Sequence, residues 1–175
     1  MSLNQSSLDF LEEENIALKM EENQGFDFGM WYKAFQSYDV SLYDQIVLVN
    51  DSCVLFKSLD GFSNWASIDR SDFKGITFSE ALAPHIQSYF ILLTKKAIPL
   101  VADYFKQKGV LSNIKEVISE YEIGLSTFLL SKGLKMAAYM DNDGYNGEYS
   151  PYYHCIDHHL QKGIPLIKKK ILFAS

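Results

Sequence analysis

The chain has 175 residues, of which 47% are hydrophobic, and a formal net charge of −6. This length suits a single domain over residues 1–175, with 1–15 as an N-terminal helix and lead-in and 16–175 as the core. The apolar fraction excludes a disordered protein, and the acidic balance argues against a nucleic-acid partner. Two cysteines form no metal or disulfide pattern, and no segment is apolar enough to span a bilayer, so we expect a cytoplasmic protein.

The first part of the chain predicts alternating helices and strands. Residues 7–14 suit a helix capped by Ser7, and residues 16–20 suit a short strand. Apolar residues recur at helical spacing over 30–35. The run 46–49 is apolar without polar alternation, which predicts a central strand buried on both faces. Strand, helix and strand in this order are typical of a βαβ unit in an α/β fold.

The triplet Asn50-Asp51-Ser52 closes that strand. A polar triplet after a buried strand costs desolvation unless it binds something, and ligands of open α/β sheets lie at the carboxyl ends of strands. Its hard oxygens suit Mg²⁺ or Mn²⁺ and, through the metal, a diphosphate. A plain turn is the other interpretation, because all three residue types form turns, and the triplet alone favours it.

The middle of the chain contains weaker strand signals followed by a clear helix. Residues 75–78 suit a short strand. Residues 85–93 suit a stronger one, whose polar start we expect to be exposed and a candidate site, with its end buried. Residues 95–106 predict a helix that ends at Gly109.

A long amphipathic helix should follow, capped by Ser112. Its apolar face is formed by Ile114, Val117, Ile118, Tyr121, Leu125, Phe128 and Leu129. Glu122 lies at the border of that face, where partial desolvation would make it a better proton acceptor near neutrality. The alternative is a rim glutamate whose carboxylate simply reaches water.

The C-terminal part predicts a strand over 134–140, a polar loop over 141–151 and a basic tail. His154 and His158 are four positions apart, as in some zinc sites, but the glutamate of a zinc protease is missing, and an exposed helix surface is favoured. One of these histidines could still join a metal site built from distant segments. The three lysines 168–170 could touch anionic lipid, although a solvated helix face is the simpler interpretation.

Five motifs in order resemble the rhamnan synthesis protein F family of bacterial polysaccharide glycosyltransferases over about residues 23–170. They are Asn23-Gln24-Gly25-Phe26-Asp27-Phe28-Gly29, Tyr43-Asp44-Gln45-Ile46-Val47-Leu48-Val49-Asn50-Asp51-Ser52, His85-Ile86-Gln87-Ser88-Tyr89-Phe90, Tyr121-Glu122-Ile123-Gly124-Leu125-Ser126 and Gly163-Ile164-Pro165-Leu166-Ile167-Lys168. The resemblance implies a GT-A-like nucleotide-diphospho-sugar transferase fold: one α/β domain with a mostly parallel central sheet flanked by helices.

The resemblance also implies roles at the matching positions. The donor nucleotide would be approached by Asn23, Gly25, Asp27 and Asn50. A Mg²⁺ or Mn²⁺ ion would be held by Asp51, Ser52 and His154. The acceptor and donor sugars would meet at His85, Gln87, Ser88 and Tyr89. Glu122 would be the general base, and sugar rings could stack on Tyr145, Tyr149, Tyr152 and Tyr153.

The expected activity is transfer of a sugar, such as rhamnose or another deoxyhexose, from a nucleotide-diphospho-sugar to a growing cell-surface polysaccharide or lipopolysaccharide. The acceptor would be a saccharide or a lipid-linked saccharide, with at most peripheral contact at the inner face of the plasma membrane. The chain departs from the family pattern in two places. Asn50 and Ser52 replace acidic residues of a standard DXD motif, which leaves one carboxylate for a metal. The N-terminal strands that hold the nucleobase are short, which is the main support for an alternative, a non-catalytic saccharide-binding or assembly module. A metal-dependent hydrolase using His154 and His158 ranks last.

Overall fold

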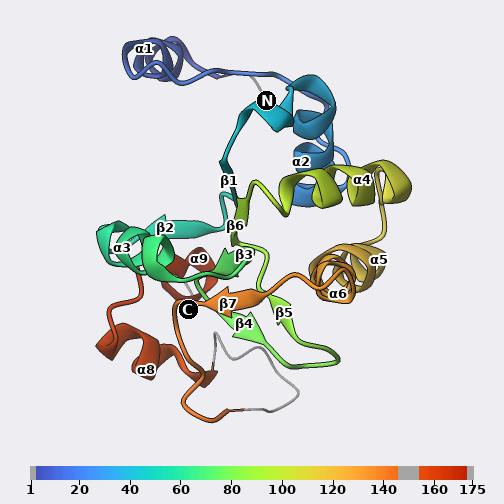
Figure 1. Ribbon diagram of the computed structural model, residues 1–175. Helices are drawn as coiled ribbons and strands as arrows, with labels where there is room; N and C mark the ends of the chain where they lie inside the picture. Colours follow the sequence, from blue (N-terminus) through green and yellow to red (C-terminus); the bar gives the residue numbers. More distant parts are fainter. Residues whose placement is uncertain (1–2, 146–153, 173–175) are drawn as a thin grey trace.

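The protein, a computed structural model that describes residues 3–145 and 154–172, is built on a four-stranded sheet of order β1-β6-β3-β7 (Figure 1). These strands are β1 (Gln45–Val49), β6 (Phe90–Thr94), β3 (Phe73–Gly75) and β7 (Met136–Ala138). β6 runs antiparallel to both β1 and β3, and β3 pairs with β7 in parallel. The mixed α/β class is confirmed, but the expected mostly parallel sheet is wrong. No helix crosses over between β3 and β6, so β6 returns in the opposite direction.

Two small sheets complete the strand structure. β4 (Phe78–Ser79) pairs with β5 (His85–Ile86), and β2 (Cys53–Leu55) pairs with β8 (Leu166–Lys168), both antiparallel. The strand predicted over 85–93 is therefore broken into β5 and β6. Its polar start is also buried and not exposed, because residues 85–87 are covered by the helix that carries Glu122.

The helices confirm most of the sequence predictions. They are α1 (Gln5–Glu13), α2 (Phe26–Ser37), η1 (Val40–Leu42), α3 (Asp60–Ile68), α4 (Ile98–Lys108), α5 (Ile114–Glu116), η2 (Val117–Ile123), α6 (Gly124–Ser131), α8 (Ile156–Gln161) and α9 (Lys169–Leu172). Asn4 and Asn113 cap α1 and α5 in place of the predicted Ser7 and Ser112, because their side chains accept the first free N–H groups. Gly109 caps the C-terminal end of α4. Its φ of 66° is a conformation that glycine adopts easily because it has no Cβ.

The segment η2 is a π-helix inside the predicted amphipathic helix. A π turn holds more residues than an α turn, so the apolar face is displaced along the helix. Val117 and Tyr121 remain buried, but Ile114 and Ile118 are exposed, contrary to the single face that the period of 3.6 predicts.

Two apolar cores lie on either side of the sheet. One joins α2, α4 and η2 to the sheet through Phe28, Phe105 and Tyr121, and Phe28 stacks on Tyr121 with ring centroids 4.9 Å apart. The other joins α3 to β6 and β8, with Phe62 packed edge-on against Phe90. Sequence motifs distant along the chain are fixed to one another by these cores.

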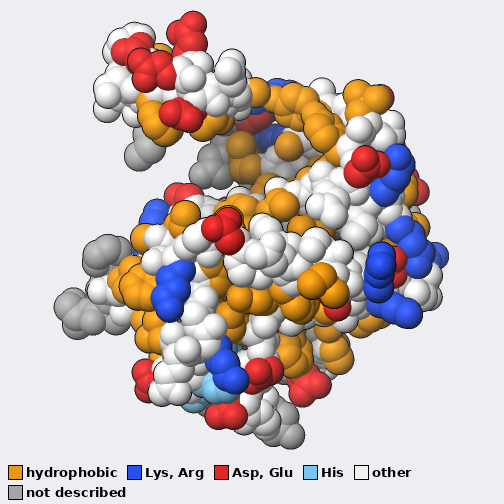
Figure 2. Space-filling model, turned by 60° about the vertical axis from the view of Figure 1, so that its left-hand side comes forward, with side chains coloured by type: hydrophobic (Ala, Val, Ile, Leu, Met, Phe, Trp, Pro, Cys, Tyr) orange, Lys and Arg blue, Asp and Glu red, His pale blue; other side chains and the backbone are white. Residues whose placement is uncertain are grey.

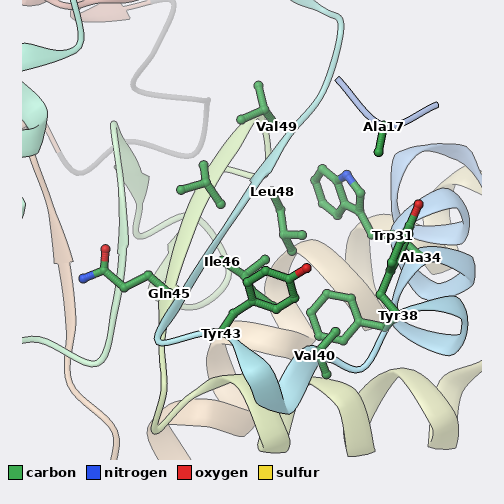
Figure 3. A pocket seen from close by; sticks show the side chains of 12 residues that line it. Ala17, Trp31, Ala34, Tyr38, Val40, Tyr43, Gln45, Ile46, Leu48 and Val49 are labelled. Atoms are coloured by element: carbon green, nitrogen blue, oxygen red, sulfur yellow. The ribbon is translucent and has the colours of Figure 1, made fainter. Parts of the chain in front are cut away.

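β1 is an edge strand and not the central strand predicted from its apolar sequence. Val47 and Val49 are 45% and 46% exposed. A groove of about 630 Å³ follows the free edge of β1, with Trp31 and Tyr38 on one side and Ala17 beyond (Figure 3). The apolar run does not reveal this exposure, because a strand's composition does not tell how many neighbours it has.

The N-terminal segment that carries α1 packs little against the rest of the protein. α1 has no buried residue and stands away from the rest of the molecule at the top left of Figure 2. Residues 16–20 form no strand, contrary to prediction, and Ile16, Leu18 and Met20 are exposed. Their composition suits a strand, but no neighbouring strand pairs with them in the described residues. No helix in the described residues is long and apolar enough to cross a membrane.

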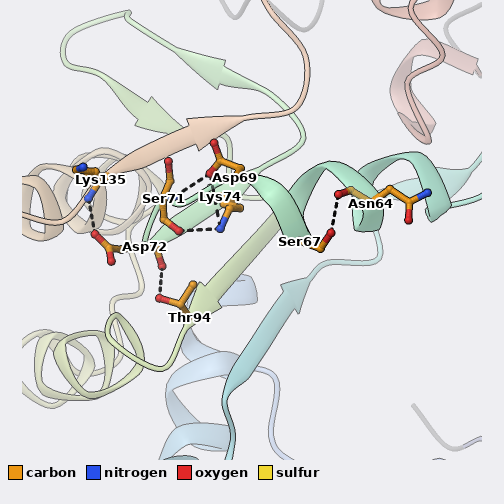
Figure 4. Close-up of polar contacts among 8 residues, drawn as sticks. All are labelled: Asn64, Ser67, Asp69, Ser71, Asp72, Lys74, Thr94 and Lys135. Carbon is orange, nitrogen blue, oxygen red and sulfur yellow. Dashed lines mark hydrogen bonds and ion pairs between the residues drawn. The ribbon is translucent and has the colours of Figure 1, made fainter.

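Polar contacts fix the start of β3 (Figure 4). Lys74 is 2% exposed, and its ammonium donates to the carbonyl of Ser71 at 2.7 Å and lies 3.7 Å from Asp69. Asp72 accepts the N–H of Lys135 at 2.8 Å, which ties β3 to the segment leading into β7.

Candidate functional site

The five sequence motifs meet at the end of β1. The first contact joins the first two motifs, where the Asn50 amide donates to Asp27 Oδ2 at 3.2 Å. The second joins the strand end to the third motif, because the Asn50 N–H donates to the Tyr89 carbonyl at 3.4 Å. The third joins that motif to η2, because the Ser88 N–H donates to Glu122 Oε1 at 3.3 Å.

The fifth motif reaches the same place through β8. β8 pairs with β2, which begins immediately after Ser52, and the Lys169 N–H donates to the Ser52 carbonyl at 2.8 Å. The Lys168 ammonium lies 5.4 Å from the centre of the Tyr89 ring. Segments from four parts of the chain therefore lie at the end of β1, and η2 is joined to them through Ser88.

The triplet Asn50-Asp51-Ser52 forms a turn. Asn50 Oδ1 accepts the N–H of Ser52 at 3.1 Å and its hydroxyl at 2.6 Å, which is the geometry of an Asx turn. The turn interpretation is thus right about the backbone. The hydroxyl of Ser52 is engaged by Asn50, whereas Asp51 at the tip of the turn is exposed.

Asp51 lines a hollow of about 1030 Å³ with most of the predicted donor-binding residues. The other lining residues are Asn23, Gln24, Gly25, Phe26, Asp27, Met30, Val110 and Ser112. The volume is slightly above the range of about 300–1000 Å³ that is typical of small-molecule sites. Asn23, Gly25 and Asp27, which the sequence placed near a donor nucleotide, thus share one hollow with Asp51. Asn50 lies beside it through its contact with Asp27.

Two glycines let the loop before α2 form this wall. A Cβ on Gly29 would lie 2.0 Å from the Gln24 carbonyl oxygen, so the loop folds tightly onto the first turn of the helix. Gly25 has a φ of 76°, and a Cβ there would lie 2.7 Å from Val110. Larger residues at either position would displace the loop from the hollow.

The pKa of the Asp27 carboxyl is raised in the folded protein. Partial burial raises its pKa above the ordinary value of 3.8, the hydrogen bond from Asn50 opposes the rise, and the charge of Asp51 adds to it. The two carboxylates are therefore close enough to repel each other. A divalent cation between them would relieve this repulsion.

The residues predicted to meet the acceptor form a mostly buried network. His85 and Gln87 are 6% and 4% exposed, and the Thr77 hydroxyl donates to Gln87 Oε1 at 2.8 Å and lies 2.8 Å from the Tyr89 hydroxyl. The ring of His85 lies 2.7 Å from the Ala83 carbonyl. Ser88 is partly exposed, so of these four it is the residue with most access to a ligand.

Glu122 lies in the π-helical segment η2 and is partly exposed. π turns are rare and often occur at functional sites. Four positions later, Ser126 Oγ accepts the N–H of Ile86 at 3.2 Å, so two side chains of one helix face hold the segment 86–88. The Glu122 carboxylate is thereby fixed beside Ser88.

His154 lies elsewhere, at the start of the C-terminal helical region, where its ring stacks on Tyr145 at 5.0 Å. Residues 3–145 and 154–172 contain no group of three or more His, Cys, Asp or Glu side chains that could hold a metal. His158 contacts Asp141 at 2.7 Å. Tyr149, Tyr152 and Tyr153, predicted to stack on sugars, lie outside the described residues.

Sequence reasoning missed several residues of this site. Thr77 holds both Gln87 and Tyr89 but lies in a weakly patterned stretch, and no sequence signal marked it. Val110 and Ser112 line the hollow although they belong to a connection between helices. Phe26, the first residue of α2, stands in the first motif, but no sequence signal marked its side chain as part of the site.

Comparison with known proteins agrees with the motif series. The chain matches the family model described as rhamnan synthesis protein F over residues 2–175. No curated protein and no solved structure gives a significant match. The family links the chain to polysaccharide synthesis. Because the match covers nearly every residue, the chain belongs to the rhamnan synthesis protein F family.

Proposed function

We propose that this chain is a glycosyltransferase domain that binds a nucleotide-diphospho-sugar in the hollow beside Asp51 and transfers its sugar to a saccharide acceptor held near Glu122. One observation supports the proposal: consecutive hydrogen bonds and peptide links run from Asp27 in the wall of the hollow, through Asn50, Tyr89 and Ser88, to Glu122. Family membership supports a role in polysaccharide synthesis.

The chemistry of the hollow suits a Mg²⁺ or Mn²⁺ ion. Asp27 and Asp51 would hold it, and they fit because both line the hollow and the charge of Asp51 adds to the rise that burial produces in the pKa of Asp27. Protein sites for Mg²⁺ often supply one or two carboxylates and leave the other positions to water and substrate phosphates, so a cage of three protein ligands is unnecessary. The ion, when bound, would stabilise negative charge on the diphosphate leaving group. We keep His154 outside this ligand set because its ring packs on Tyr145.

The proposed reaction is a displacement at the anomeric carbon of the donor sugar. The acceptor hydroxyl oxygen forms the new bond to that carbon, while the bond from the carbon to the diphosphate breaks and its electron pair leaves with the diphosphate. Glu122 accepts the proton of the acceptor hydroxyl. The N–H of Ser88 holds one carboxylate oxygen, so the other can face the acceptor.

The buried network of the third motif would act by positioning. His85, Gln87 and Tyr89 would hold the segment that carries Ser88, and Ser88 would contact the acceptor. An acceptor attached to a lipid would bring the domain to the inner face of the membrane through the acceptor itself.

Calorimetry with a panel of nucleotide-sugars, with and without Mn²⁺, tests the proposal. We expect heat for at least one donor, dependent on the metal and lost in Asp51→Ala. Asp60→Ala, which removes an exposed carboxylate on α3, is the matched control and should bind as the unaltered chain does. If no nucleotide-sugar gives binding heat with or without Mn²⁺, the transferase is rejected and the saccharide-binding module is favoured. Equal binding in Asp51→Ala would reject the assigned place of the donor.

A further inference from the structure

Phe26 is an exposed aromatic residue in a conformation that disfavours it. Its side chain is 45% exposed, and its backbone φ is 57°. Positive φ is uncommon for any residue with a Cβ and is a genuine outlier for a bulky one. Phe28, two residues later, is 3% exposed and stacks on Tyr121, so the core of this region is filled without Phe26.

The strain has a structural cause. Gly25 precedes Phe26 with a φ of 76°, and Gly29 leaves no room between helix and loop, so the chain must turn sharply at the start of α2. Phe26 completes this turn. Strained residues of this kind cluster at ligand sites, where the surrounding structure holds them in place.

The strained residue Phe26 lies in the wall of the hollow. Phe26 lines the same hollow as Asp27 and Asp51, and Met30, one turn further along α2, extends its apolar wall. The exposed amides of Asn23 and Gln24 line the hollow as well. One hollow therefore combines an aromatic ring, hydrogen-bonding amides and a pair of carboxylates.

We propose that Phe26 is the stacking platform for the nucleobase of the donor, with the amides of Asn23 and Gln24 reading the edge of the base. This inference rests on the proposed function and adds to it the part of the ligand that is recognised. A base has a flat face for the ring and a hydrogen-bonding edge for the amides, whereas the diphosphate matches the cation-binding carboxylates. The hollow would also supply a base site to a chain whose described residues form no strand before β1.

Titration with nucleoside diphosphates carrying each of four bases, and with pyrophosphate, in the presence of Mn²⁺ tests the inference. Phe26→Ala should weaken binding of the preferred nucleoside diphosphate roughly 5- to 150-fold, the range expected for losing one base stack. Pyrophosphate has no base, so its affinity should not change. Phe26→Tyr keeps a flat ring and should retain affinity. Phe56→Ala is the matched control, because Phe56 is 52% exposed but does not line the hollow.

The outcomes separate the inference from the proposed function. If the unaltered chain binds neither nucleoside diphosphates nor pyrophosphate, the donor site itself is rejected. If it binds nucleoside diphosphates and Phe26→Ala binds them equally well, the donor site stands and the stacking role is rejected. If Phe26→Ala weakens binding of the nucleotide-sugar found by calorimetry but binds the matching nucleoside diphosphate as tightly as the unaltered chain does, the ring stacks on the donor sugar, and the assignment to the base is overturned.

Discussion

Asn50 donates a hydrogen bond from its side-chain amide to Asp27 Oδ2, and so joins the end of β1 to the first turn of α2. The same residue accepts two hydrogen bonds from Ser52 and donates its backbone N–H to Tyr89. An aspartate at position 50, as in a standard DXD motif, would carry a negative charge in place of the amide donor and would repel Asp27. The departure from the acidic motif therefore has a structural reason.

The first prediction concerns the charge of Asp27. Asn50→Ala removes the hydrogen bond that lowers its pKa, while burial and the charge of Asp51 still raise it, so the pKa of Asp27 should rise further. Carboxyl-carbon NMR titration of both proteins would measure this. Asn64→Ala, an exposed change on α3, should leave Asp27 unaffected. A fall in the pKa of Asp27 after Asn50→Ala would show that the amide does not stabilise the carboxylate.

The second prediction separates chemistry from structure at Glu122. Glu122→Gln keeps an oxygen that can accept the N–H of Ser88, so folding and donor binding should be retained. It removes the proton acceptor, so transfer should slow about 10²- to 10⁴-fold. Glu116→Gln, an exposed change in α5, is the control. Transfer at the original rate by Glu122→Gln would remove Glu122 from the reaction.

The sequence was sufficient to predict the family and several residues that lie together, but not the arrangement of the strands in the sheet. The series of five motifs predicted the family, and Asn23, Gly25, Asp27 and Asp51 do line one hollow. The helix at 26–37 followed from apolar residues at helical spacing over 30–35, and the helix at 98–108 was predicted over 95–106 with its end at Gly109.

Strand neighbours and direction depend on contacts that periodicity does not encode. The run at 46–49 is apolar but lies at an edge. The run at 85–89 is buried except for the partly exposed Ser88, because Thr77, Glu122 and Ser126 supply its hydrogen-bond partners. Burial of polar residues is predictable only when those partners are known.

The third prediction tests the tight loop that shapes the hollow. In Gly29→Ala the new Cβ would lie 2.0 Å from the Gln24 carbonyl oxygen, a backbone atom that moves only if the loop moves. We expect a loss of about 1–3 kcal/mol in the free energy of unfolding. Nucleotide binding should also weaken. Urea unfolding measures the first effect, and Gln36→Ala, an exposed change near the end of α2, should show neither. Full stability in Gly29→Ala would mean that the loop is not closely packed on α2.

The fourth prediction concerns acid stability and Asp72. Burial alone would raise the pKa of this carboxyl, but the N–H of Lys135 and the ammonium of Lys96 outweigh that effect and lower it below 3.8. A lowered folded-state pKa adds stability that is fully present above the unfolded value and is lost as the pH falls through the folded value. Asp72→Asn should therefore be less stable than the unaltered chain at pH 6, and the difference should shrink below about pH 3.8. Urea unfolding at a series of pH values measures this difference. Asp103→Asn, which removes an exposed carboxylate from α4, should change stability little at any pH, and a constant deficit in Asp72→Asn at all pH values would assign the loss to packing instead of charge.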